Sequence, residues 1–288
     1  MRLRLCRFCV VLLALVRVMT FAADGCGPDD FVTIGNSNGT AVVSLVGATV
    51  VSYVPSGESD VFFRSAGFDL TSRAFPHGGM PIAWPWFGRK IGSTAAEDLH
   101  GFSRLFRWRI CERTASQLVL SLTSDEKTRA LSDFDFRLTA AFEMRDGLSV
   151  ALRVENTGTK PLPFGAGYHP FFRVSDNARM RVSGLDGLSD IPVGIDRAFP
   201  AGAGRFELID DGMRRTIEIV ASGANKVNVW NDFAQWPEIY AHGGGTEFCC
   251  VEPMITNKDK VGKVLQPGER YDLTIALRVL GLRSARLK

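Results

Sequence analysis

Residues 76–89, PHGGMPIAWPWFGR, decide how this chain folds, together with LHGFSRLFRW at residues 99–108. The paired glycines permit positive φ angles and close backbone approach, whereas the prolines fix φ and remove N–H donors. Regular helices and central strands tolerate few such residues. We therefore predict a rigid, irregular loop that presents aromatic faces and polar tips. Trp84 has two readings, a wall of a binding pocket or plain core packing.

Alternation of apolar and polar residues dominates the chain outward from this loop. Four segments show it in strict form, at residues 118–122, 136–142, 148–154 and 271–279. This period of two is typical of strands with one face on a core. Sustained helical periodicity is absent, and only residues 124–131 suggest a turn of helix, capped by Ser124 or Asp125. We predict an all-β protein, a sandwich or barrel, with a single domain over residues 31–282.

Composition excludes several classes of protein. The 288 residues are 45% hydrophobic and 23% charged, which favours a large core over disorder. The net charge of +3 falls to −1 without residues 1–22, because that segment carries four arginines and no acidic residue. No basic domain remains for nucleic acid, so we expect no nucleic-acid partner.

The cysteines show no spacing typical of a zinc site, and we expect no metal. Cys249 and Cys250 are adjacent, so on a strand they would point to opposite faces and not bond to each other. Free buried thiols are the expectation for Cys26, Cys111, Cys249 and Cys250.

Residues 1–22 combine arginines, an apolar run from Phe8 to Val16 and the small residues Ala22 and Ala23. This arrangement resembles a secretory signal peptide, and its apolar run is too short to span a bilayer, so we expect no stable membrane insertion. Arg17 interrupts the pattern, and Met19 offers an internal start. A true signal peptide and a mis-assigned N-terminal extension therefore both remain open.

The order of the motifs resembles the aldose 1-epimerase (galactose mutarotase) superfamily, most closely its glucose-6-phosphate 1-epimerase branch. The GG pair with Pro81 and Pro85 is followed by HGFSR at residues 100–104. Further blocks follow in the family's order: DEKTRALSDFDF at 125–136, GYHPFFRVSD at 167–176, IDRAF at 195–199, Trp230–Asn231 and CVEP at 250–253. The resemblance implies a large antiparallel β-sandwich, the galactose mutarotase-like supersandwich, and a monomer that uses no cofactor.

Interconversion of sugar anomers needs a base at the C1 hydroxyl and an acid at the ring oxygen. His169 lies in a Gly-rich and aromatic segment and titrates near neutrality. Glu252 ends an apolar run, where burial would raise its pKa toward that of a useful base. By resemblance, His169 is the catalytic acid and Glu252 the catalytic base.

Sugar hydroxyls and a phosphate require further side chains. The resemblance matches His100 and Asp196 to hydroxyl-binding residues and Arg104 to a phosphate-binding arginine. The branch usually carries an arginine just before the GG pair, where this chain has His77. Four nearby cations would then compensate: Arg64, Arg73, Arg89 and Lys90. His77 as an imidazolium would do so at lower pH.

Three functions follow from these assignments. The first is a cofactor-free glucose-6-phosphate 1-epimerase, whose partner is a small sugar phosphate. The second is an aldose 1-epimerase acting on an unphosphorylated sugar, and the third a non-catalytic carbohydrate-binding module on the same sandwich. Because sugar phosphates are intracellular metabolites, the first favours the cytoplasm, whereas a true signal peptide would favour export.

Overall fold

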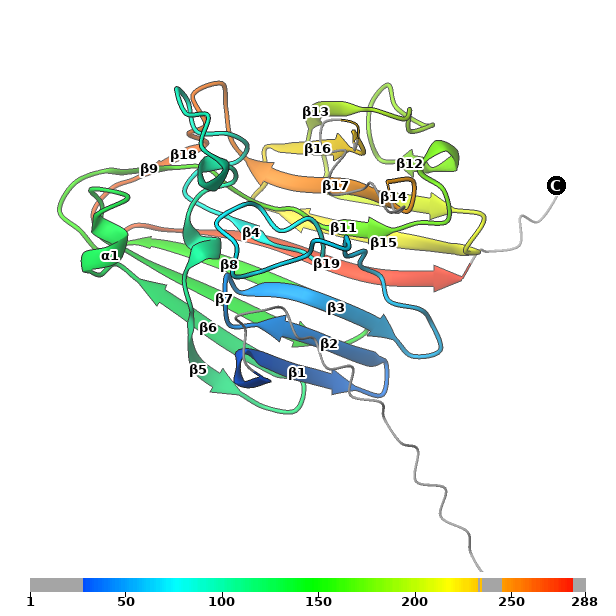
Figure 1. The fold of residues 1–288 in the computed structure, drawn as a ribbon, viewed down its shortest axis with the longest axis horizontal. Helices are drawn as coiled ribbons and strands as arrows, with labels where there is room; N and C mark the ends of the chain where they lie inside the picture. The colour runs from blue at the N-terminus through cyan, green and yellow to red at the C-terminus, as the bar shows by residue number, and fades with distance from the viewer. Residues whose placement is uncertain (1–27, 233, 235–244, 282–288) are drawn as a thin grey trace, which may run out of the picture.

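The computed structural model describes residues 28–232, 234 and 245–281 (Figure 1). The predicted leader at residues 1–22 lies outside the described residues, as does residue 282. Most of the described chain forms antiparallel strands, and its α-helix is the single turn α1 (Glu126–Arg129). The Asp125 side chain accepts a hydrogen bond from Thr128 N and so caps α1, as predicted. Four 3-10 turns complete the helical structure of this part: η1 (Pro28–Asp30), η2 (Ala96–Asp98), η3 (Ser103–Leu105) and η4 (Asn177–Arg179).

An eight-stranded antiparallel sheet forms one layer of the molecule. Its strands, in spatial order, are β12 (Arg181–Ser183), β14 (Arg205–Asp210), β15 (Arg215–Ser222), β19 (Arg270–Gly281), β8 (Leu148–Asn156), β7 (Phe136–Met144), β6 (Gln117–Thr123) and β5 (Arg109–Arg113). Burial alternates strictly along β7, where Phe136, Leu138 and Ala140 face the core. The period of two in the sequence is therefore the period of burial.

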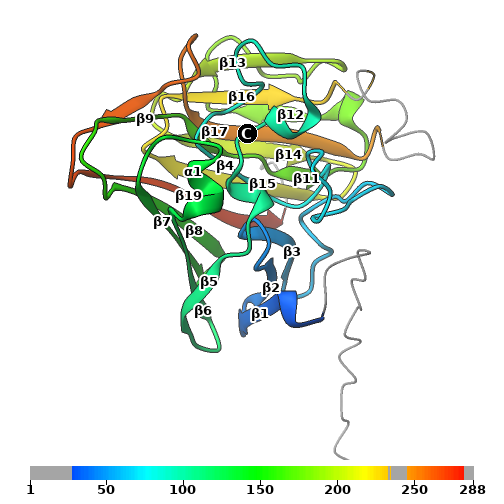
Figure 2. The ribbon, with the colours of Figure 1, turned by 60° about the vertical axis from the view of Figure 1, so that its left-hand side comes forward.

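Two smaller sheets form the opposite layer. The larger has the order β13 (Asp196–Pro200), β16 (Lys226–Trp230), β17 (Phe248–Ile255), β10 (Ala166–Tyr168) and β4 (Ile82–Ala83), and β11 (Phe171–Arg173) also pairs with β17. The other contains β1 (Phe31–Asn36), β2 (Gly39–Ser44) and β3 (Thr49–Pro55). A separate ribbon pairs β18 (Lys263–Leu265) with β9 (Leu162–Phe164). Figure 2 shows β13, β16 and β17 side by side above β1–β3.

The two layers pack face to face around a large hydrophobic core cluster. Strands β1 and β2 contact β6 and β7, while β10 contacts β19. The Tyr168 hydroxyl on β10 crosses this interface: it accepts from Leu152 N at 2.9 Å and donates to Leu273 O at 2.6 Å. The arrangement confirms the predicted all-β antiparallel sandwich. Within the part of the chain that is described, no helix has the length and apolar character needed to cross a membrane.

The loop at residues 76–89 is irregular, as predicted, and β4 is its one short strand. Gly101 adopts a φ of 75°, and a Cβ there would lie 2.0 Å from the carbonyl oxygen of Trp84. Only glycine fits this crossing of the two halves of the loop. Trp84 itself is fully buried against Phe102 and Phe136, so core packing is the correct reading of Trp84.

The cysteine predictions hold in part. Cys249 and Cys250 are free, buried thiols, and they belong to different core clusters because successive side chains of β17 point to opposite faces. Cys111 is free but exposed on β5, so the prediction that it is buried is wrong. Cys26 lies outside the described residues.

Candidate active site

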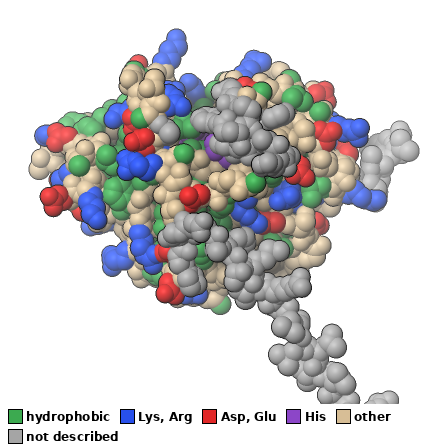
Figure 3. Space-filling model, viewed as in Figure 1, with side chains coloured by type: hydrophobic (Ala, Val, Ile, Leu, Met, Phe, Trp, Pro, Cys, Tyr) green, Lys and Arg blue, Asp and Glu red, His purple; other side chains and the backbone are tan. Residues whose placement is uncertain are grey.

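A cavity of about 500 Å³ opens over the sheet that contains β10, β16 and β17. Five residues singled out in the sequence lie in its lining together with Glu252: His77, Arg89, His100, His169 and Asp196. Figure 3 shows histidine surface (purple) near the centre of this face, with Lys or Arg side chains (blue) above it. A cavity of this size suits a small polar ligand such as a monosaccharide.

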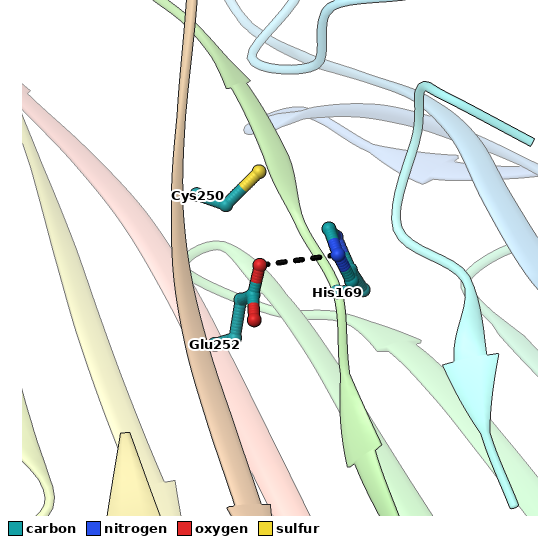
Figure 4. Close-up of side chains that lie close together, drawn as sticks. All are labelled: His169, Cys250 and Glu252. Carbon is teal, nitrogen blue, oxygen red and sulfur yellow. Dashed lines mark ion pairs between the residues drawn. The ribbon is translucent and has the colours of Figure 1, made fainter. Parts of the chain in front are cut away.

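His169 and Glu252 face each other at the floor of this cavity (Figure 4). The distance between His169 Nε2 and Glu252 Oε1 is 3.1 Å, and the side chains are 7% and 1% exposed. His169 directly follows β10, and Glu252 lies on β17, with which β10 pairs. The loop at residues 79–81 fixes the histidine, because His169 N donates to Pro81 O and Phe171 N donates to Gly79 O.

Burial controls the charge of both groups. It lowers the pKa of His169 to about 3, helped by the neighbouring His77. Burial also raises the pKa of Glu252 well above its usual range, against the lowering effect of a hydrogen bond from Asn228. The short distance alone would favour an ion pair, but the loss of solvation in this closed floor is the larger effect. Burial therefore favours the neutral form of both groups, an uncharged imidazole for His169 and a protonated carboxyl for Glu252.

Aromatic rings pack around the imidazole of His169 and make its surroundings apolar. Phe171 stacks on the His169 ring at 4.7 Å, and Phe75 lies at 4.9 Å from it. Trp230 meets the same ring edge-on at 5.9 Å. Apolar surroundings of this kind strengthen the electrostatic interactions, hydrogen bonds included, between the polar groups inside them.

His100 and His77 supply further neutral imidazoles. His100 Nδ1 accepts a hydrogen bond from Gly88 N at 3.2 Å, so the ring proton is assigned to Nε2, which remains a donor. Burial, with the nearby His169, holds the pKa of His100 well below its usual range. Burial also lowers the pKa of His77 to about 4. His77 is therefore a neutral ring at neutral pH, and its predicted role as a cation stays confined to lower pH.

Asn228 joins two of the predicted site residues. Its side-chain amide donates to Asp196 Oδ1 at 3.1 Å and to Glu252 Oε2 at 3.2 Å. The register of the sheet sets this contact, because Asn228 on β16 lies directly opposite Glu252 on β17. Asn228 thereby fixes one carboxyl oxygen of Glu252 and leaves the other directed at His169.

Arg104 is absent from the cavity lining, and its predicted role in binding phosphate stays a prediction. Its side chain is buried, and the guanidinium donates to four backbone carbonyls, those of Leu99, Ala74, Arg73 and Glu97. These bonds tie the segment at 73–74 to the segment at 97–99. Arg104 therefore shapes the loops that carry Phe75, His77 and His100. Trp84 is also absent from the lining. Trp230 lines the cavity and forms an aromatic wall there.

The sequence model of the family described as aldose 1-epimerase matches residues 30–191, more than half of the chain. This chain belongs to the aldose 1-epimerase family. The match includes His77, His100 and His169. The resemblance seen in the sequence is thus confirmed.

Curated relatives of this epimerase-family chain carry a narrower name. A protein of Salmonella typhimurium named "Putative glucose-6-phosphate 1-epimerase" is 28% identical over 225 residues, which cover 70% of this chain and 74% of the relative. A protein of Cenchrus ciliaris with the same name is 27% identical over 286 residues, covering 87% and 84%.

Solved structures of the family share the fold. A Salmonella typhimurium protein described as "a putative mutarotase" superposes with a TM-score of 0.74 at 24% identity, over 88% of this chain and 92% of that chain. An Escherichia coli K12 protein described as "a Putative aldose 1-epimerase" superposes with a TM-score of 0.72 at 18% identity, over 88% of this chain and 99% of that chain. At these identities the likeness concerns the fold.

The sequence did not single out five polar residues that line the cavity of this aldose 1-epimerase family member: Lys226, Asn228, Thr256, Asn257 and Lys260. Asn228 carries a weak signal, since it is the polar residue within the apolar run VNVW at 227–230. Lys226 and Lys260 sit among other surface lysines, and no pattern distinguishes them. Their place in the cavity depends on the pairing of β16 with β17 and on the turn after β17.

Proposed function

We propose that this protein interconverts the α and β anomers of a hexose 6-phosphate, as a glucose-6-phosphate 1-epimerase that uses no cofactor. The observation that carries the proposal is the 3.1 Å contact between His169 Nε2 and Glu252 Oε1 at the floor of a sugar-sized cavity. Such a pair can remove a proton and supply one within a single site. The names of the curated relatives also support a hexose 6-phosphate.

The reaction starts with the pair in its ionic form. When the sugar enters, its hydroxyls form hydrogen bonds to the two side chains in place of the water that burial removed. The charged forms are then stabilised, and the proton of the Glu252 carboxyl passes to His169. Glu252 then takes the proton of the C1 hydroxyl while His169 protonates the ring oxygen. The bond between C1 and the ring oxygen breaks, and the open aldehyde rotates about C1–C2. Reversal of both proton transfers closes the ring on the other face, with no net change in either residue.

Three cationic side chains in the cavity lining are our candidates for the phosphate: Arg89, Lys226 and Lys260. Lys260 Nζ lies beside Gly88, where a Cβ would come within 3.1 Å of it, so the ammonium sits next to the backbone that carries Arg89. Lysine and arginine together can neutralise a dianion, the lysine as a point charge and the arginine as a fork.

Anomer exchange measured by NMR saturation transfer tests this function. We expect faster exchange for glucose 6-phosphate than for glucose or galactose. Replacement of Lys260 by alanine should lower the rate for the phosphate ester and leave the free sugars unaffected. Lys258→Ala is the matched control, because Lys258 is exposed on the same turn and does not line the cavity. Equal loss for phosphorylated and free sugars would contradict a phosphate contact by Lys260.

An unphosphorylated aldose is the second candidate substrate. It is favoured by the neutral state of His77 and by the engagement of Arg104 with backbone carbonyls. Exchange accelerated only for free sugars would establish it. Binding of sugars without acceleration would instead indicate a carbohydrate-binding module.

A further inference from the structure

Cys250 lies beside the pair formed by His169 and Glu252 (Figure 4). One ligand atom from each of these three residues lies within 4.8 Å of the others, and all three residues are buried. Cys250 and Glu252 are two positions apart on β17, so both side chains project from the same face of the strand. The thiol contacts the Glu252 carboxyl.

Thiolate, imidazole and carboxylate are the ligand types that zinc and similar thiophilic cations prefer. Zinc bonds these atoms at about 2.0 to 2.3 Å, so the ligand atoms of a tetrahedral ion lie about 3.3 to 3.8 Å apart. The His169–Glu252 distance of 3.1 Å is slightly shorter, and the 4.8 Å limit of the cluster is slightly longer. Small side-chain rotations therefore suffice to centre an ion among the three.

A second observation points to a ligand at this place. Glu252 Oε1 is buried and makes no hydrogen bond of normal geometry within the described residues, although it lies 3.1 Å from His169 Nε2 and the Cys250 thiol contacts the carboxyl. A buried carboxyl oxygen without such a partner is costly, and an ion bound there would remove the cost. The other oxygen, Oε2, is already held by Asn228, so the carboxyl is fixed with Oε1 toward the cluster.

We propose that His169, Cys250 and Glu252 bind one thiophilic divalent cation, with Zn²⁺ as the type case, and that the bound ion inhibits the protein. On binding, the thiol and the carboxyl each release a proton to solvent, and the neutral imidazole donates its lone pair. The two negative charges formed balance the charge of the ion. Three protein ligands leave a fourth position open toward the cavity.

Inhibition follows because the ion occupies the lone pairs that anomer exchange requires. This consequence rests on the proposed function, whereas binding of the ion does not. Arg89, Lys226 and Lys260 face the same cavity and oppose a cation, while Asp196 favours it. The site therefore competes with an anionic sugar phosphate, and a bound phosphate ester should protect it.

Titration of the full-length protein with Cd²⁺ tests the site directly, since each thiolate bound to Cd²⁺ gives an ultraviolet charge-transfer band. Cys250→Ala should remove one thiolate's share of the band and weaken the tightest site by at least about 100-fold, beyond the 10- to 100-fold seen for lost outer-shell partners. Cys249→Ala is the matched control, because Cys249 is equally buried but points to the other face of β17. His169→Ala should weaken the same site, and Cys250→Ser, which keeps the side-chain volume, guards against a folding defect.

Two results overturn the proposal. One is a Cys250→Ala protein that binds Cd²⁺ as tightly as wild type and with the same band. The other is an equal loss in Cys249→Ala, which would place the bound thiolate elsewhere. Inhibition by Zn²⁺, measured against each variant's own metal-free rate, should weaken by the same factor in Cys250→Ala and stay unchanged in Cys249→Ala. Failure of anomer exchange in wild type would leave the Cd²⁺ measurement intact and would refute the proposed function alone.

Discussion

The protonation state of His169 can be measured through the pH dependence of stability. The pKa of this imidazole is about 3 in the folded protein, because burial disfavours its charge. In an unfolded chain it is about 6.5. Between these values the unfolded chain binds more protons than the folded one, so folding stability falls as the pH is lowered. Within this range, a group of this kind lowers the free energy of unfolding by about 1.4 kcal/mol for each unit that the pH falls.

Integration of that slope gives the size of the effect. Relative to pH 8, the neutral His169 lowers the free energy of unfolding by about 2 kcal/mol at pH 5. At pH 3 and below the cost approaches about 5 kcal/mol. Replacement by glutamine, which does not titrate, removes this contribution. We therefore expect wild type to lose about 2 kcal/mol more than His169→Gln between pH 8 and pH 5.

Urea unfolding of both proteins at the two pH values measures the difference, with each protein's value at pH 8 as its own reference. Parallel losses would show that His169 has an ordinary pKa in the folded state. If wild type instead loses less stability than His169→Gln between pH 8 and pH 5, the neutral state of the pair is refuted. An imidazolium paired with a Glu252 carboxylate has a raised pKa, and its stabilisation would be present below pH 6.5 and lost as the pH rises.

Three further changes test other parts of the structure. Glu252→Gln should lower the rate of anomer exchange by about 100- to 10,000-fold with an unchanged circular dichroism spectrum, and a near-wild-type rate would remove Glu252 from the role of base. Tyr168→Phe should lower the free energy of unfolding in urea by about 1–3 kcal/mol, because Leu152 N loses its buried acceptor; no change would mean that water replaces the hydroxyl. Arg104→Ala should reduce exchange of glucose 6-phosphate and glucose equally, because Arg104 organises loops; a loss confined to the phosphate ester would restore its predicted role.

Local pattern predicted those features of the fold that depend on local physics. The alternation in residues 136–142 and 148–154 became β7 and β8, because an antiparallel pair buries every second side chain. The short helix capped by Asp125 was also predictable, since its hydrogen bonds lie within four residues. Motif order likewise placed His169 and Glu252 in one site, although they are far apart in the chain.

The other features of the site depend on tertiary contacts, which the sequence pattern does not reveal. Arg104 has the residue type that a phosphate would need, but the carbonyls that surround it come from segments up to 31 positions away. Lys260 reaches the cavity only because the turn after β17 folds back over Gly88. Asn228 contacts Glu252 through strand register, which no single strand encodes. Charge alone does not reveal whether a cation faces a ligand or a backbone oxygen.

The hydrogen bond from Gly88 N to His100 Nδ1 has a consequence for substrate choice. A main-chain N–H can donate a hydrogen bond but cannot accept one. It therefore keeps the proton of the His100 ring on Nε2 at every pH at which the ring is neutral. Under the proposed function, a sugar that contacts His100 must then offer an oxygen lone pair to Nε2. A deoxy analogue that lacks it would leave a buried N–H without an acceptor, and sites of this kind reject such analogues far more strongly than an apolar pocket rejects a missing methylene. Under the proposed function, the backbone of the loop at residues 76–89 thus contributes to discrimination between sugars.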